Sequence, residues 1–537
     1  MAKEIFFEGE ARAKIQAGVN KLADAVRITL GPKGKLVILQ KGDPVFTLDG
    51  VTVANDIKLK DKVEAMGAEL VKSVAQRTND QAGDGTTTAT ILSQSLLNEG
   101  LKGVAAGVDP IRIKKGIEDG AKVVLAQLKE MARPIKTKSE MSDVATISSR
   151  DRTIGDTIAG IFEEIGKDGV VTVEESKQVG MWSETVEGMQ IDSGWISPYF
   201  MTNPERQEAV VEEPYVLVTA QVISTNQDIV NILTRVAESD KKAIVIVADN
   251  VTGEALQTLV INKMRGVLKC VVVKAPGYGE QKTAFLEDIA TLTGAKVISE
   301  ELGKKVEDAV MEDLGRCGRF LSYRTRSVFV DGKGNKKEIT TRTKLVKSQL
   351  DDERSDFKRT ILEKRYARMS GGVAVIKVGS VSEAEQREKQ YRIEDAVNAV
   401  KSALDEGIVI GGGLAFVRAA ASVEKLLPLA ADIDYRYGLE VLKNAILRPA
   451  RQVIENTGEN PDVILTTLKA TAEGENAGWD AAKEEYVPDM IKAGIIDPLK
   501  VERVALEQAV SVVGNFIKTG AVVADEPEPE KKKETSQ

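Results

Sequence analysis

Three threonines follow a Gly-Asp-Gly turn at residues 83–90, where the sequence is GDGTTTAT. The glycines allow a tight turn and close backbone approach, and the threonines open a helix whose free amides and positive end favour a phosphate. Asp84 would repel a phosphate unless a cation lay between them, so the segment predicts Mg²⁺ held by Asp84 and phosphate oxygens. The alternative is a Thr-capped helix with an aspartate in its turn, but the full string favours the phosphate site.

The sequence contains no histidine, which restricts the chemistry open to any site. This excludes Ser-His-Asp and Cys-His nucleophiles, His-ligated metals and histidine proton shuttles. Carboxylates, hydroxyls, lysines and backbone amides remain, and Mg²⁺ suits them because it prefers oxygen ligands. With only Cys270 and Cys317, neither a disulfide framework nor a Cys-based zinc site is expected.

Weaker motifs elsewhere could belong to a nucleotide site, and each has a simpler alternative. Residues 29–34, TLGPKG, could expose amides to an anion or simply end a helix. Asp49, which precedes a glycine between apolar runs, is typical of a hairpin turn. Residues 411–413, GGG, could cradle a nucleotide or permit close packing. Asp395 lies on a predicted helix, where an acidic side chain is usually solvated. Residues 277–283 do not match the spacing of a P-loop and are predicted to be an ordinary loop.

The elements that must position these residues follow from apolar periodicity, which predicts α-rich ends around an α/β middle with a partly parallel sheet. Helices are expected at 9–28, 63–78, 86–97 and on to about 133, at 228–237, 254–265 and 283–292, and at 338–370, 383–405 and much of 412–518. Strands are expected at 36–39, 45–48, 169–174, 215–220, 243–248, 271–274 and 373–378.

Length and composition bound the remaining possibilities. The 537 residues suggest about three or four domains. No apolar run is long enough for a membrane span, and the N-terminus resembles neither a secretory signal nor a transit peptide, which favours a bacterial-type cytoplasm. The net charge of -8 and the absence of a long basic patch argue against nucleic-acid binding. The charged tail at 525–537 is expected to be disordered.

Two helices of the middle region are unusually apolar. The apolar residues of 254–265 spread over about 240° of the helical wheel and those of 228–237 over about 160°, whereas a stripe of about 100° suffices to bury one face. Both helices could be deeply buried. Alternatively, one face packs on the sheet while another stays exposed to bind partners.

Together, the motifs resemble those of the group I, GroEL-like chaperonins. TLGPKG, LDGVTVA, NDQAGDGTTTAT, GGVAVIKVG, RIEDA and GGG occur in the family's order, and GWISPYF, GEALQTLVIN and VKAPGYG fill the middle as they do in the family. The resemblance runs from about residue 2 to 524. It implies a multidomain α+β and α/β fold with an α-rich equatorial ATPase domain at 1–133 and 406–537, an intermediate hinge domain at 134–187 and 373–405, and an α/β apical domain at 188–372.

The resemblance also implies a role for individual residues. Asp84 matches the Mg²⁺ ligand, Asp49 a carboxylate near the γ-phosphate, and Asp395 the carboxylate that positions the attacking water. Matches to the ATP-binding residues are Thr29, Leu30, Gly31, Pro32, Gly85, Thr86, Thr87, Thr88, Gly412, Asp480, Ala481, Ala482 and Asp497. Matches to residues that bind substrate and lid, or lie near them, are Trp195, Tyr199, Phe200, Val230, Leu233, Leu256, Val260 and Ile261.

The activity implied by this resemblance is that of an ATP-hydrolysing molecular chaperone. ATP and Mg²⁺, with K⁺, would drive a two-state cycle in which apolar apical helices capture non-native polypeptides and then bind a GroES-like co-chaperonin lid. The assembly would be two stacked heptameric rings. Some positions depart from the family pattern: Leu48 replaces a lysine, Asp480 an asparagine and Ser193 an arginine that pairs with an acid matching Glu383, and the tail lacks Gly-Gly-Met repeats.

Two other classes of function are alternatives to an ATP-dependent chaperone. The departures leave room for a chaperonin-derived scaffold or adhesion protein with little folding activity, which lid-dependent refolding would separate from a chaperone. A small-molecule kinase or dehydrogenase is disfavoured, because the phosphate-binding fingerprints of those enzymes and all histidines are missing.

Overall fold

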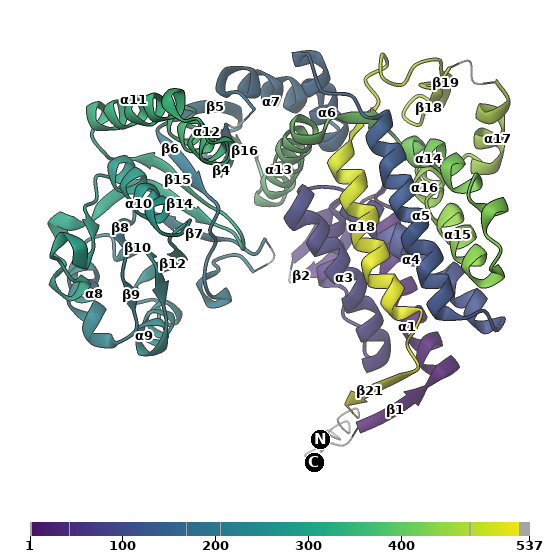
Figure 1. Ribbon diagram of the computed structural model, residues 1–537, viewed down its shortest axis with the longest axis horizontal. Helices are drawn as coiled ribbons and strands as arrows, with labels where there is room; N and C mark the ends of the chain where they lie inside the picture. The colour runs from purple at the N-terminus through teal and green to yellow at the C-terminus, as the bar shows by residue number, and fades with distance from the viewer. Residues whose placement is uncertain (1–2, 42, 168, 205, 472–473, 526–537) are drawn as a thin grey trace. The chain divides into compact units, whose positions relative to one another are not determined.

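The computed structural model describes residues 3–525 apart from 42, 168, 205, 472 and 473 (Figure 1). It forms two compact units, one of residues 1–160 and 380–537 and the other of residues 161–379. The predicted division into three domains stays a prediction. Asp525 ends a strand, so it does not belong to the predicted disordered tail, and residues 526–537 lie outside the described part. Within that part, no helix has the length and apolar character of a membrane span.

The first unit is mainly helical and joins both ends of the chain. Its first and last strands, β1 (Lys3–Phe7) and β21 (Ala521–Asp525), pair antiparallel. The helix α18 (Leu499–Phe516) packs against three helices from the N-terminal part, as Figure 1 shows. The helices of this part are α1 (Glu8–Arg27), α2 (Gly50–Asp56), α3 (Lys62–Ala82), α4 (Thr86–Ala105), α5 (Pro110–Met131), α6 (Lys138–Ser149) and the start of α7 (Arg152–Ile165). The later ones are α13 (Glu383–Glu406), α14 (Leu414–Glu424), α15 (Ile433–Ala445), α16 (Arg448–Thr457) and α17 (Pro461–Thr471).

Short strand pairs complete this unit. They are β2 (Val37–Lys41) with β3 (Asp43–Thr47), β17 (Ile408–Ile410) with β20 (Ile496–Pro498), and β18 (Gly478–Asp480) with β19 (Glu485–Val487). The predicted helices and the two early strands are therefore present, whereas β17 to β20 had no clear signal in the sequence.

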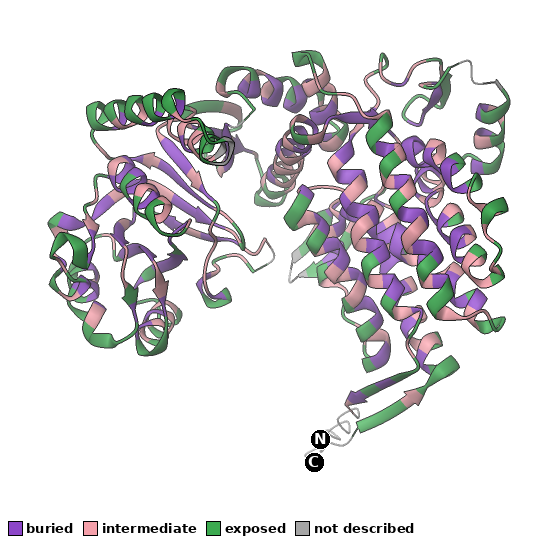
Figure 2. Cartoon of the chain, in the orientation of Figure 1, coloured by how far each residue is buried: buried purple, intermediate pink, exposed green. Residues whose placement is uncertain are grey.

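Buried aliphatic side chains hold the helices of the first unit together. In α1, Ile15, Val19, Leu22 and Val26 recur at the helical period and are all buried. They belong to one continuous core that includes residues of α3, α4, α5, α15 and α18. Figure 2 shows buried positions along the facing sides of these helices and exposed positions outside.

The second unit contains a mixed sheet flanked by helices. The strands β8 (Tyr215–Thr219), β10 (Ala243–Ala248) and β12 (Lys269–Lys274) run parallel to one another, as the sequence predicts. The sheet continues antiparallel through β14 (Gly315–Ser322), β15 (Ser327–Gly332) and β6 (Gly188–Ile191), and β7 (Ala209–Glu212) and β13 (Val297–Ile298) pair beside this path. Its helices are α8 (Asn226–Glu238), α9 (Gly253–Met264), α10 (Glu280–Thr293), α11 (Lys336–Asp352) and α12 (Asp356–Ser370).

A second, three-stranded sheet lies in the same unit. Its centre is β16 (Val373–Gly379), which runs parallel to β4 (Val170–Glu175) and antiparallel to β5 (Gly180–Val186). The predicted multidomain fold class, with α-rich and α/β parts, is confirmed. The segment at 277–283 is a loop that leads into α10, as predicted.

Close contact between α1 and α3 depends on two glycines. A Cβ atom on Gly18 would overlap the carbonyl oxygen of Glu64, and one on Gly67 would overlap that of Ile15. Neither overlap can be relieved by a side-chain rotation, because the opposing atoms belong to the backbone. The two helix axes must therefore separate if either glycine is replaced.

We expect Gly18→Ala to destabilise the first unit by about 1–3 kcal/mol, because it overpacks a helix contact. Gly9→Ala is the matched control, since Gly9 lies in the same helix and a Cβ atom added there would meet no other atom within 4 Å. The control should be neutral or stabilising by up to about 1 kcal/mol through helix propensity. Urea denaturation followed by far-ultraviolet circular dichroism measures both, and equal midpoints for the two variants would contradict the packing argument.

Candidate active site

The Gly-Asp-Gly turn joins α3 to α4 and presents one carboxyl group. Gly83 (φ 72°) and Gly85 (φ 81°) both adopt the left-handed conformation, which favours glycine. Asp84 accepts hydrogen bonds from the Gly85 amide at 2.6 Å and from the Ser148 hydroxyl at 3.1 Å. Protein atoms surround its carboxyl group, and this burial raises its pKa, with a further rise from the charge of Asp49. A cation would relieve this cost.

Asp395 lies on the face of α13 that contacts this turn. A Cβ atom on Gly83 would overlap the side chain of Asn398, and Ser402 donates a hydrogen bond to the Ala82 carbonyl at 2.8 Å. Asn398 and Ser402 follow Asp395 by three and seven residues, so all three lie on one side of the helix. Asp395 is half-buried rather than solvated, which differs from the usual state of an acidic residue on a helix.

Asp49 does not form the hairpin turn that was the simpler alternative. It is the N-cap of α2 and accepts hydrogen bonds from the amides of Val51 and Thr52, at 3.1 and 2.8 Å. A Cβ atom on the next residue, Gly50, would overlap the hydroxyl of Thr87. The start of α2 therefore lies against the first turn of α4, which brings Asp49 and the threonines together.

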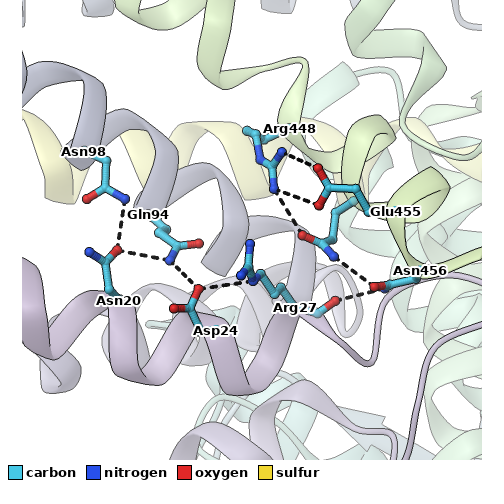
Figure 3. A network of polar contacts seen from close by, with 9 residues as sticks. Asn20, Asp24, Arg27, Gln94, Asn98, Arg448, Glu455 and Asn456 are labelled. Carbon is cyan, nitrogen blue, oxygen red and sulfur yellow. Dashed lines mark hydrogen bonds and ion pairs between the residues drawn. The ribbon is translucent and has the colours of Figure 1, made fainter. Parts of the chain in front are cut away.

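Polar contacts hold the loop at residues 28–34 in place. The side chain of Asn456, on α16, donates hydrogen bonds to the carbonyls of Arg27 and Leu30, at 3.1 and 2.8 Å. Gln452 donates to Asn456 and accepts from Arg448, so the loop is anchored in the network drawn in Figure 3. A second contact comes from Arg150, which donates a hydrogen bond to the Thr29 carbonyl at 2.7 Å. The end of α1 is thus both a helix terminus and a fixed part of the site.

The glycine segment at 411–413 is positioned by the β17–β20 pair, in which Val409 lies opposite Asp497. The Asp497 carboxyl group accepts hydrogen bonds from the amides of Gly412 and Gly413. A Cβ atom on Gly413 would press on the backbone of Ala450, whereas one on Gly412 would have no neighbour within 4 Å. Close packing explains Gly413, and open space beside Gly412 suits a ligand.

Glu502 is a buried acid that sequence analysis missed. It lies in the first turn of α18, is 4% exposed, and leaves Oε2 without a hydrogen-bond partner. Burial and the charge of Asp497 raise its pKa well above the usual value for glutamate. Burial, with the charge of Asp84, also raises the pKa of Asp497 to about 6. The two groups share a hydrogen bond, in which a protonated Glu502 donates to Asp497.

The turn after β18 lies beside the 28–34 loop. Asp480 is buried and accepts hydrogen bonds from the amides of Ala482 and Lys483, at 2.9 and 3.2 Å. Its neighbours Ala481 and Ala482 are buried and exposed, respectively. Two residues further on, Glu484 forms an ion pair with Lys33 of the 28–34 loop at 2.9 Å.

The structure therefore collects the predicted nucleotide residues from seven separate segments of the first unit. Contacts or electrostatic interactions link the segments around 29–33, 49–50, 83–88, 395–402, 411–413, 480–484 and 497, and Arg150 joins the first of them to Asp84. No group of three His, Cys, Asp or Glu side chains within the described chain could hold a metal by itself. One carboxylate at Asp84 nevertheless fits Mg²⁺, which takes one or two carboxylates beside phosphate oxygens and water. The predicted roles themselves stay predictions.

The predicted substrate-binding residues divide into exposed and buried sets in the second unit. Tyr199, Val230 and Ile261 are 62%, 54% and 47% exposed, and Leu256, Val260 and Trp195 are half-buried. The short helix η1 (Pro198–Phe200) and α8 both contact α9, so the exposed residues lie on adjoining elements. Met264, exposed at 67%, adds to this apolar surface.

Two predicted contact residues do not lie on that surface. Phe200 is fully buried and Leu233 is 5% exposed, and both belong to the core beneath the helices. Their assignment to substrate or lid binding does not fit this structure, because a side chain within the core cannot contact a partner. The choice between fully buried and two-faced helices is settled for α8 and α9, each of which buries one side and exposes another.

Comparison with known proteins shows which family this architecture belongs to. The model of the TCP-1/cpn60 chaperonin family matches residues 22–527. The chain belongs to this family. Among solved structures, it is similar to the chaperonin gp146 from the bacteriophage EL 2 (Pseudomonas aeruginosa), crystallised in the presence of ATP-BeFx, with 20% identity and a TM-score of 0.69. The match covers 97% of this chain and 99% of that one, and shows a shared fold.

Membership of the chaperonin family gives the chain a role in protein folding. Chaperonins are ATPases that form oligomeric rings and bind non-native polypeptides. The predicted recognition as a GroEL-like chaperonin is therefore confirmed.

The Asp497–Glu502 pair predicts how stability depends on pH. Both folded-state pKa values are raised, so the folded chain holds protons that the unfolded chain has released. The free energy of unfolding should consequently fall as pH rises from about 4 to about 6, and beyond that range for Glu502, by up to about 1.4 kcal/mol per pH unit for each such proton. Glu502→Gln should make this fall shallower. Urea denaturation without nucleotide and with a chelator tests it, and parallel pH curves for both proteins would contradict the assignment.

Proposed function

We propose that this chaperonin uses ATP and Mg²⁺ to drive capture and release of non-native polypeptides. The observation that carries the proposal is the convergence of Asp84, Asp395 and the amide-rich segments on one place in the first unit. A carboxylate beside a helix N-terminus and open glycine backbone suits a phosphate bridged by a cation.

We assign each residue of the nucleotide site a separate role. Asp84 would hold the Mg²⁺, which neutralises developing charge on the phosphates when bound. The amides at the start of α4 and the hydroxyls of Thr86–Thr88 would contact phosphate oxygens. Asp480 and Asp497 would face the base and ribose. The K⁺ that the family resemblance implies stays a prediction.

Asp395 would orient the attacking water. It is half-buried on the α13 face that packs against the Asp84 turn, so it can approach a phosphate bound there. Asp49 is less free to act on water, because its carboxyl oxygens already accept three hydrogen bonds as the cap of α2. We assign Asp395 the larger effect on hydrolysis and Asp49 a supporting electrostatic one.

Client capture would use the exposed apolar surface of the second unit. Tyr199, Val230, Ile261 and Met264 present apolar groups on adjoining elements, and an exposed patch of this kind is typical of a protein-binding site. A GroES-like lid would compete for the same surface, so that its arrival releases the client. A cytoplasmic location of bacterial type stays a prediction from the sequence.

Ring assembly has support in the small sheets of the first unit. The two-stranded sheets β1–β21 and β2–β3 both expose apolar side chains, and an isolated two-stranded sheet is marginally stable. The exposed residues are Ile5, Phe7, Ile38, Phe46 and Val523. A second copy of the chain would cover these groups and pair the open edges. Two stacked heptameric rings are the proposed assembly.

Steady-state ATP turnover tests the catalytic assignment. We expect Asp395→Ala to bind ATP but to hydrolyse it at least about 100-fold more slowly, because the water loses its orienting carboxylate. Asp405→Ala is the matched control, since Asp405 lies on the same helix, is 58% exposed and pairs with Lys500. Normal turnover by Asp395→Ala would remove its role. No Mg²⁺-dependent turnover by the wild type would overturn the proposed function.

Suppression of aggregation tests the client surface. We expect a Val230→Ser, Ile261→Ser double variant to need about 30-fold more protein to keep a denatured model protein soluble, because two lost apolar contacts of about 1 kcal/mol each forfeit about 2 kcal/mol. Leu345→Ser is the control, an exposed apolar residue on α11 of the same unit. Equal potency of the double variant and the control would show that clients bind elsewhere.

A further inference from the structure

Arg150 joins the end of α6 to the nucleotide loop, and no sequence motif assigns it a role. Its guanidinium Nη2 donates a hydrogen bond to the carbonyl oxygen of Thr29 at 2.7 Å. Asp84 lies within electrostatic reach of the guanidinium, as do Glu388 and Arg392 of α13. The side chain thus points to the region where the phosphates of ATP are proposed to bind.

The guanidinium of Arg150 has unused donor capacity. Arginine carries five N–H donors, and the one to Thr29 is the hydrogen bond it makes within the described chain. It forms no ion pair within 4 Å among the described residues, and Arg150 is an exposed residue. Other cations near the site are engaged: Lys33 pairs with Glu484, and Arg392 pairs with Glu388.

The site has an excess of negative charge that the guanidinium of Arg150 can partly neutralise. Asp49, Asp84 and Asp497 are all acidic, and the phosphates of ATP would add further negative charge. One Mg²⁺ cannot offset all of it, and nucleotide sites usually include a protein cation that contacts the phosphates. A planar guanidinium suits this task because it can donate two parallel hydrogen bonds to phosphate oxygens.

The backbone at Arg150 supports a functional reason for this residue. Arg150 is the C-cap of α6 with φ 56° and ψ 27°, in the left-handed region where glycine or asparagine is usual. Strain of this kind in a non-glycine residue points to a role for its side chain. A glycine would fit the turn better but would present no cation.

We propose that Arg150 is a phosphate-binding residue, whose free N–H groups contact the terminal phosphates of ATP while Nη2 stays on the Thr29 carbonyl. The proposal rests on the proposed function, because it requires ATP at this site. It adds a residue from outside the recognised motifs to the phosphate-binding set.

Nucleotide affinity of the intact chain tests the proposal, with the non-hydrolysable ATP analogue adenylyl imidodiphosphate and with AMP, each with Mg²⁺. Arg150→Gly is the main variant, because glycine suits the left-handed backbone and folding should be preserved. We expect it to bind the ATP analogue about 10–100-fold more weakly, as loss of a charged hydrogen bond implies, and AMP within about twofold of the wild type. Arg150→Lys should recover part of the loss.

Arg152→Ala is the matched control, since Arg152 is a neighbouring arginine that forms an ion pair with Asp143 at 2.6 Å. It should bind both nucleotides as the wild type does. Equal losses for the ATP analogue and for AMP in Arg150→Gly would show that Arg150 only positions the Thr29 loop, and unchanged affinity for the analogue would remove it from the site. If the wild type itself binds neither nucleotide, the proposed function fails and this proposal fails with it.

Discussion

Negative charge is concentrated where α3 passes into α4, and the first unit is organised around it. Asp84, Asp497 and Glu502 lie within electrostatic reach of one another, and burial raises the pKa of each. Buried carboxylates that lack a positive partner cost folding free energy. A proton on Glu502, amides on Asp497 and the nearby Arg150 each offset part of this cost, and a bound cation at Asp84 would offset more.

The helices around these acidic residues hold their side chains in fixed positions. Left-handed Gly83 and Gly85 let Asp84 turn inward, and α13 packs on that turn with the face that carries Asp395. The same rigid frame holds the loop after α1 through Asn456. In the second unit, by contrast, α9 leaves Ile261 and Met264 exposed, as the proposed capture of clients requires.

Much of this arrangement could be predicted from the sequence. Periodic apolar residues such as Ile15, Val19 and Leu22 predict helices well, and the GDGTTTAT string indicates a phosphate site through its glycines and hydroxyls. Periodicity cannot say which apolar residue of a helix faces the sheet, and the family resemblance that assigned Phe200 and Leu233 to partner binding cannot show that both lie in the core. Arg150 and Glu502 had no motif, because contacts over long sequence separations create their environments.

Cation binding by the nucleotide complex tests the central claim most directly. Electron paramagnetic resonance of Mn²⁺, used in place of Mg²⁺, can count the ions bound by the wild type and by Asp84→Asn with ADP present. We expect one nucleotide-dependent Mn²⁺ for each wild-type chain and none for the variant, whose apo form should unfold at an equal or higher temperature because a buried charge is gone. Equal Mn²⁺ binding by both proteins would contradict the account of Asp84 as the residue that requires a cation.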